Sequence, residues 1–136
     1  MPSKTEIWAG RVLSILAILF MLADGVMKLM KPASVVEATV RLGYAESMIV
    51  GIGTVLVIST ILYAIPRTSV LGAILITGYL GGAVASNVRA QQVTFNIMFP
   101  AVFGALVWLG LWLRDPRLRS LMPFTEPDRP GRPDRR

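Results

Sequence analysis

Three long segments without a charged residue are the feature that most constrains what this chain can fold into. They are residues 47–66, 68–88 and 90–113, separated only by Arg67 and Arg89. An α-helix crosses the roughly 30 Å hydrocarbon core of a bilayer with about 20 mostly apolar residues, so each segment is long enough to span a membrane. Short connections make neighbouring helices antiparallel. We therefore predict membrane-spanning helices over about 47–66, 69–88 and 94–113.

A further span near the N-terminus is less regular. Residues 12–23 are apolar but too few to cross a bilayer, and continuing the helix to Met30 brings in Asp24 and Lys28. A cleaved signal peptide, with Lys4 in its basic region, is the alternative interpretation. No small-x-small cleavage site follows the apolar stretch at the expected place, which favours a retained transmembrane helix over about 8–30.

The segment after this span predicts a short helix that lies along the membrane surface. Pro32 ends the first helix. Glu37 and Arg41 are spaced i,i+4 on one side of the short helix, and Gly43 is a plausible stop. The opposite side carries its apolar residues, which are Val35, Val36, Val40 and Leu42. Such an amphipathic segment is typical of an interfacial helix.

The predicted fold class is therefore all-α: a four-helix transmembrane bundle with a short interfacial helix between helices 1 and 2. We expect this domain to occupy residues 1–121. Residues 122–136 are rich in proline and arginine and have little apolar surface to bury. We expect them to form a disordered, basic cytoplasmic tail.

The composition excludes much cofactor and catalytic chemistry. The chain has no cysteine and no histidine, it is 54% hydrophobic and 16% charged, and its mean hydropathy is +0.61. Disulfides, histidine-ligated haem, thiolate or imidazole zinc sites and histidine-based triads are thereby excluded. We predict no metal site and no catalytic residues.

The basic residues favour contact with a membrane. The net charge is +6, and the arginines flank the spans or fill the tail without interleaved aromatic residues. This pattern favours anionic membrane lipid over nucleic acid as a partner. Ten of the 14 basic residues are Arg67 and those of the two terminal segments. The positive-inside rule then predicts a multi-pass inner-membrane protein with both termini in the cytoplasm.

Asp24 is the most informative polar position, because an unpaired carboxylate at membrane depth is costly. Lys28 can pair with it one helical turn along, and Arg89 is expected at the same, outer end of its own span, near Asn87. Two interpretations stay open. In the first interpretation, an outward-facing ligand pocket is formed by Asp24, Lys28, Asn87 and Arg89. In the second, a structural ion pair joins the first span to the third.

Two features of the third span also have two interpretations each. Tyr79, near its middle, lines a ligand pocket or bonds to a neighbouring helix. Gly78 and Gly82 form a small-x-x-x-small motif, which is typical either of close packing within the bundle or of a dimer interface. Packing within the bundle is the commoner outcome, and we expect it here.

Several stretches together resemble the DoxX-like family of small four-helix bacterial membrane proteins. They are residues 24–29, 42–44, 62–68, 71–85 and 113–118. The run Tyr79-Leu80-Gly81-Gly82-Ala83, with Val88-Arg89 after it, is the most specific of them. The wider family takes its name from subunits of quinone-linked oxidoreductase systems, so the resemblance implies a quinone as a candidate cofactor.

The resemblance is incomplete at two positions. Asp24, Lys28, Arg67, Tyr79 and Arg89 match the family pattern. A histidine usually stands where this chain has Asn87, and an acidic residue often occurs near Leu56. If those groups carry proton or redox chemistry in relatives, this chain lacks it.

Three functions are compatible with these observations. The first is an accessory membrane subunit that binds a quinone, a lipid, another membrane subunit or a second copy of itself, with Asp24, Lys28, Tyr79, Asn87 and Arg89 as candidate ligand-binding residues. The second is a small proton-coupled transporter that depends on Asp24. The third is a membrane-embedded isomerase or reductase, for which the sequence shows no catalytic pattern.

Overall fold

The computed structural model describes residues 3–122, and every regular element in this part of the chain is a helix. The elements in order are α1 (Lys4–Met30), α2 (Ala33–Arg41), the 3-10 turn η1 (Glu46–Met48), α3 (Ile49–Ala64), α4 (Ser69–Arg89), α5 (Thr94–Arg114) and α6 (Pro116–Leu121). The four longest helical segments are long and apolar enough to cross a membrane. The predicted four-helix bundle with a short helix after the first span is confirmed.

The ends of α1 follow from local chemistry. Ser3 and Glu6 form a capping box, in which the Ser3 hydroxyl accepts from the Glu6 N–H and the Glu6 carboxylate accepts from the Ser3 N–H. This cap starts the helix at Lys4, a full turn before the predicted residue 8. At the other end, Lys31 adopts a left-handed conformation with φ of 54°, and Pro32 follows.

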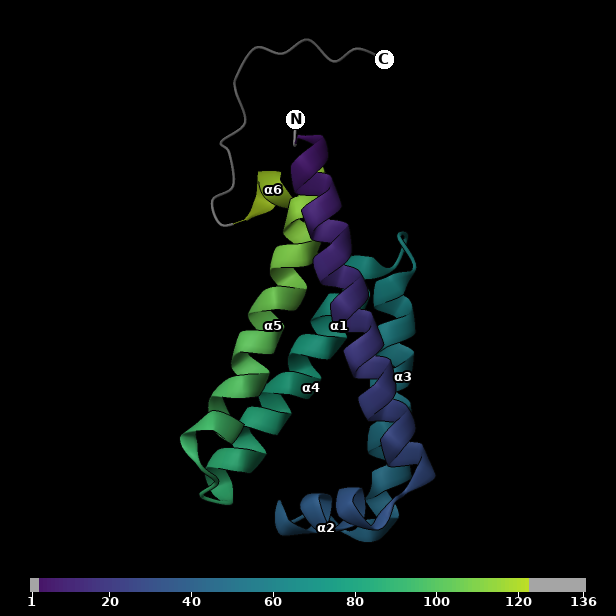
Figure 1. Ribbon diagram of the computed structural model, residues 1–136, viewed down its shortest axis with the longest axis vertical. Helices are drawn as coiled ribbons and strands as arrows, with labels where there is room; N and C mark the ends of the chain where they lie inside the picture. The colour runs from purple at the N-terminus through teal and green to yellow at the C-terminus, as the bar shows by residue number, and fades with distance from the viewer. Residues whose placement is uncertain (1–2, 123–136) are drawn as a thin grey trace.

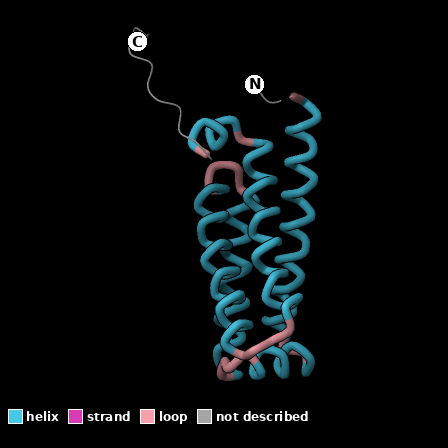
Figure 2. Tube along the Cα trace, turned by 90° about the vertical axis from the view of Figure 1, so that its left-hand side faces the viewer, coloured by secondary structure: helices cyan, strands magenta, loops and turns pink. Residues whose placement is uncertain are grey.

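The four long helices form a ring in which each packs on two neighbours. α1 lies against α3 and α5, and α4 lies against the same two helices from the other side. The beginning of α1 and the short α6 share one end of the bundle, here called the terminal end, while α2 runs across the opposite end, the α2 end (Figure 1). The turned view in Figure 2 shows the long helices running side by side between these ends.

Glycines allow the closest contacts at the terminal end. A Cβ atom on Gly10 of α1 would lie 2.8 Å from the carbonyl oxygen of Gly110 on α5. A Cβ on Gly72 of α4 would lie 2.2 Å from the backbone nitrogen of Tyr63 on α3. In lipid, where no hydrophobic drive acts between helices, such close approach strengthens the van der Waals packing that holds helices together.

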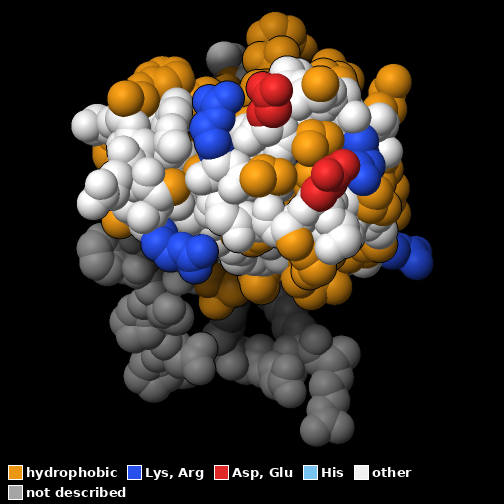
Figure 3. All heavy atoms as spheres, turned by 90° about the horizontal axis from the view of Figure 1, so that it is seen from below, with side chains coloured by type: hydrophobic (Ala, Val, Ile, Leu, Met, Phe, Trp, Pro, Cys, Tyr) orange, Lys and Arg blue, Asp and Glu red, His pale blue; other side chains and the backbone are white. Residues whose placement is uncertain are grey.

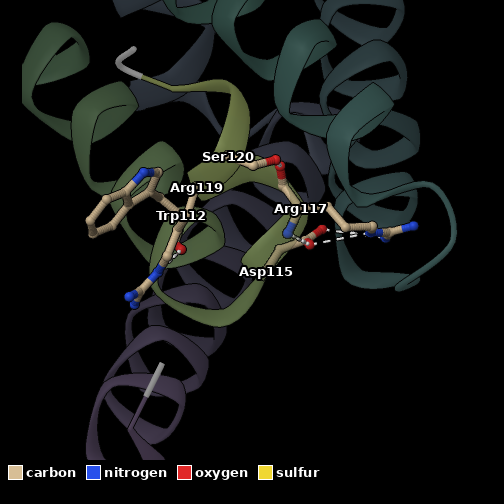
Figure 4. Close-up of polar contacts among 5 residues, drawn as sticks. All are labelled: Trp112, Asp115, Arg117, Arg119 and Ser120. Carbon is tan, nitrogen blue, oxygen red and sulfur yellow. Dashed lines mark hydrogen bonds and ion pairs between the residues drawn. The ribbon is translucent and has the colours of Figure 1, made fainter. Parts of the chain in front are cut away.

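The sequence did not predict α6, a short helix that follows α5 and packs against it at the terminal end. Asp115 caps it by accepting from the Arg117 N–H at 3.0 Å, and it also pairs with the Arg117 guanidinium (Figure 4). Of the predicted tail, only Met122 lies within the described residues.

The Arg119 side chain fastens α6 to the end of α5. The carbonyls of Trp112 and Leu113 lack their usual helical partners, because Pro116 has no N–H and the Arg117 N–H is used by Asp115. Arg119 donates to both carbonyls, at 3.0 and 3.1 Å, and its guanidinium lies 4.5 Å from the Trp112 ring centroid (Figure 4).

Candidate functional site

The α2 half of the bundle is hollow. A cleft of about 900 Å³ lies between the four long helices, and α2 contributes Val35, Ala38 and Thr39 to its lining. Each of the four long helices lines the cleft with residues from its half nearer the α2 end. On α1, for example, these residues include Asp24 and Lys28. The buried core begins at the middle of the bundle and continues to the terminal end. Its members include Ala17, Met21, Leu56, Tyr63, Ala73, Ile76, Val107 and Leu111.

One wall of the cleft is aromatic. Phe20 of α1 lies with its ring centroid 4.9 Å from that of Phe103 and 5.7 Å from that of Phe99, both on α5. Phe95 continues the row, 5.8 Å from Phe99. All four rings line the cleft. They offer flat, polarisable surfaces for a ring or a hydrocarbon chain.

The α4 part of the lining includes two glycines beside larger side chains such as Tyr79 and Asn87. Gly78 and Gly82 line the cleft, and a Cβ on either would meet nothing within 4 Å. The expectation that this pair packs against another helix within the bundle is therefore wrong. The spacing alone could not reveal this outcome, because it depends on what lies opposite the glycines.

Asp24 and Lys28 lie together on the lining of the cleft. Lys28 Nζ donates to Asp24 Oδ2 at 2.7 Å. The lysine side chain is 14% exposed, whereas that of the aspartate is 42% exposed, so the carboxylate is the more open of the two groups. The predicted alternative of an ion pair between the first and third spans is wrong, because both partners belong to α1 and no acidic partner of Arg89 occurs among residues 3–122.

Two α4 side chains add polar groups to the cleft. The Tyr79 hydroxyl has no hydrogen-bond partner within the described residues, so it does not form the interhelical bond that was one of its two interpretations. The Asn87 amide N–H donates to the Ala83 carbonyl at 2.8 Å, and its side-chain oxygen has no hydrogen-bond partner among residues 3–122. Both residues therefore keep hydrogen-bonding capacity for a ligand.

Arg89 is the candidate that the fold separates from the rest. It does not line the cleft but a smaller hollow beside it, of about 330 Å³, together with Gly43, Tyr44 and Ser86. Tyr44 and Ser86 line both spaces, and their hydroxyls are 2.5 Å apart. Sequence reasoning grouped Arg89 with Asp24 because both lie at the same end of their spans, which fixes depth but not direction around the helix.

The aromatic wall and the Tyr44–Ser86 contact are the features that sequence reasoning missed. The spacing of Phe95, Phe99 and Phe103 by four residues puts them on one face of α5, which was a detectable signal. The sequence holds no signal that Phe20 joins them, because that contact joins residues distant in the chain.

These observations define a multi-pass membrane protein with an amphipathic cleft in one half of its bundle. The chain belongs to the DoxX-like family, whose model matches residues 12–110. Comparison with curated proteins and with solved structures gave no match.

Proposed function

We propose that this protein is an accessory membrane subunit that binds a quinone in its cleft. The observation that carries the proposal is the pairing of an aromatic wall with a polar end in one cleft of about 900 Å³. Ligand sites of this size typically have mostly apolar linings and a few placed polar groups. A quinone has matching parts: a flat ring with carbonyl oxygens and an apolar chain.

The polar groups suit the carbonyl oxygens of a quinone ring. The Tyr79 hydroxyl is available as a donor, and the Lys28 ammonium has further N–H groups beyond the one used by Asp24. Phe20, Phe99 and Phe103 offer surfaces on which the ring or its chain can lie. The quinone-linked systems implied by the family resemblance agree with this ligand class.

Photo-crosslinking with an azido-quinone tests the proposal on the full chain in proteoliposomes. Tyr79→Phe removes one donor, and we expect labelling to fall about fivefold, as for the loss of one hydrogen bond. Phe103→Ala should lower it further. Glu37→Ala is the matched control, since Glu37 is an exposed acidic residue of α2 outside the cleft. Labelling that maps only to residues outside the cleft lining, or that no cleft variant changes, would overturn the proposal.

We also propose the inner membrane as the location, with the terminal end on the cytoplasmic side. Among the described residues, Lys4, Arg11, Arg67, Arg114, Arg117 and Arg119 belong to the terminal end, whereas Lys28, Lys31, Arg41 and Arg89 belong to the α2 end. This bias agrees with the positive-inside rule. Accessibility of single cysteines at position 5 and position 90 to a membrane-impermeant reagent tests it.

The transporter alternative has its own test. The Asp24 carboxylate accepts from Lys28 on the same helix at 2.7 Å, an arrangement typical of a fixed ion pair. Uptake into proteoliposomes driven by a pH gradient and abolished by Asp24→Asn would replace the accessory role with proton-coupled transport. Turnover of a quinone by the purified protein alone would instead indicate the enzyme alternative.

A further inference from the structure

Arg89 stands apart from the other cations at the α2 end. Three basic side chains there have acidic partners within 4 Å, whereas none is present for Arg89 among residues 3–122. The pairs are Lys28 with Asp24 at 2.7 Å, Lys31 with Glu46 at 3.7 Å and Arg41 with Glu37 at 3.8 Å. Figure 3, a view of this end, shows its charged side chains spread among apolar and neutral ones. The guanidinium of Arg89 therefore keeps its donors for a partner from outside this part of the chain.

The Arg89 guanidinium lies against the turn that follows α2. Gly43 in this turn has a φ of 94°, a conformation that side chains disfavour, and a Cβ there would lie 2.8 Å from Arg89 Nη2. A glycine at position 43 thus suits the turn and lets the guanidinium lie close to it. The hydrogen bond between Tyr44 and Ser86 ties this turn to α4, so the hollow has a fixed wall.

The helix dipole explains only part of this arrangement. Arg89 is the last residue of α4, where a cation is stabilised by the nearby carbonyls. That effect does not require a hollow of about 330 Å³ beside the guanidinium. A ligand that fills the hollow and accepts several hydrogen bonds accounts for it.

We propose that Arg89 and this hollow bind a phosphate group, supplied by the head group of an anionic phospholipid. A guanidinium presents a planar fork of donors that matches two phosphate oxygens, and such pairs are among the stronger hydrogen bonds in proteins. The hollow lies at the end of a candidate membrane span, where phospholipid head groups meet the protein. The site is distinct from the proposed quinone cleft, although Tyr44 and Ser86 line both.

Native mass spectrometry of the purified full chain tests this proposal with phosphatidylglycerol and with phosphatidylcholine of the same acyl chains. Arg89→Gln should lower the retention of phosphatidylglycerol about tenfold, as for the loss of a charge-assisted contact. Arg89→Lys keeps the charge but loses the planar fork of donors, so its retention of phosphatidylglycerol should lie between that of the wild type and that of Arg89→Gln. Arg41→Gln is the matched control, an exposed arginine at the same end that is already paired with Glu37. It should change retention less than twofold.

The outcomes separate the sources of the phosphate group. Loss of phosphatidylglycerol in Arg89→Gln but not in Arg41→Gln supports the lipid site. Competition by millimolar inorganic phosphate, with no preference for phosphatidylglycerol over phosphatidylcholine, would assign free phosphate as the ligand and overturn the lipid source. Equal retention by the wild type and both arginine-to-glutamine variants would overturn the site itself. Azido-quinone labelling of the same variants should stay unchanged, which keeps this test separate from that of the quinone cleft.

Discussion

The two halves of this bundle are built from similar apolar helices, yet one is filled and the other is hollow. In the terminal half, Gly10 faces Gly110 and Gly72 faces the backbone of Tyr63, so helices meet at backbone distance. In the α2 half, Gly25 and Gly53 still bring α1 and α3 together, but Gly78 and Gly82 of α4 face open space in a cleft that phenylalanines also line. A glycine in a membrane helix thus brings helices together only where another backbone or small residue lies opposite.

The halves also differ in how their hydroxyl groups are used. Tyr63, fully buried in the terminal half, donates to the Val107 carbonyl at 2.8 Å and lies 3.1 Å from the Ser14 hydroxyl. Arg114 lies over its ring, 5.3 Å from the centroid. Tyr79, in the α2 half, has no such partner in the described chain. The Tyr63 hydroxyl thus links α1, α3 and α5 in the terminal half, whereas the Tyr79 hydroxyl links no helices within the described residues.

The largest effect should come from adding one methyl group to the filled half. The Cβ of Gly72→Ala would lie 2.2 Å from the nitrogen and 2.5 Å from the Cα of Tyr63, which are backbone atoms that cannot rotate away. We expect a loss of about 3 kcal/mol or more in the free energy of unfolding, measured by denaturant titration in detergent.

Gly78→Ala, in the same helix, is the matched control for that variant. Its Cβ would meet nothing within 4 Å, and alanine favours a helix over glycine by about 1 kcal/mol. Stability should stay the same or rise. If the two variants lost equal stability, the contrast between a filled and a hollow half would be refuted.

The sequence carried enough information for the architecture but not for this contrast. Long charge-free segments such as 68–88 and 90–113 fix the spans, because the bilayer sets the required length and polarity. The cleft depends on which face of each helix meets which neighbour, and an apolar helix in lipid shows no clear polar face from which to read this. Arg89 was therefore placed at the correct end but assigned to the wrong space.

The next largest effect should come from separating the ion pair in the hollow half. Asp24→Asn leaves the Lys28 ammonium, whose side chain is 14% exposed, without its acidic partner. Partial exposure of the carboxylate screens the pair, so we expect a loss of about 1–2 kcal/mol in unfolding free energy. Asp24→Asn combined with Lys28→Met should recover most of it. A double variant no more stable than Asp24→Asn would show that the pair is not what stabilises this position.

Removing one hydroxyl from each half compares them directly. Tyr63→Phe deletes the bond to Val107 and the contact with Ser14, and should lower the unfolding free energy by about 1 kcal/mol. Tyr79→Phe should leave stability unchanged and reduce only azido-quinone labelling. The reverse pattern, with stability lost in Tyr79→Phe alone, would mean that the polar group of the cleft is structural.

The smallest expected effect concerns the contacts that hold α6 against the end of α5. Arg119→Lys keeps the positive charge but cannot reach the Trp112 and Leu113 carbonyls with a planar fork or stack equally well on the Trp112 ring. We expect a loss below about 1 kcal/mol, together with faster proteolytic cleavage near residue 115. Arg117→Lys is the control, since Arg117 is exposed and Asp115 is the one acidic partner of its side chain among residues 3–122. Equal cleavage of the two variants would show that α6 is held by its apolar contact through Leu118, which is buried, and not by the Arg119 guanidinium.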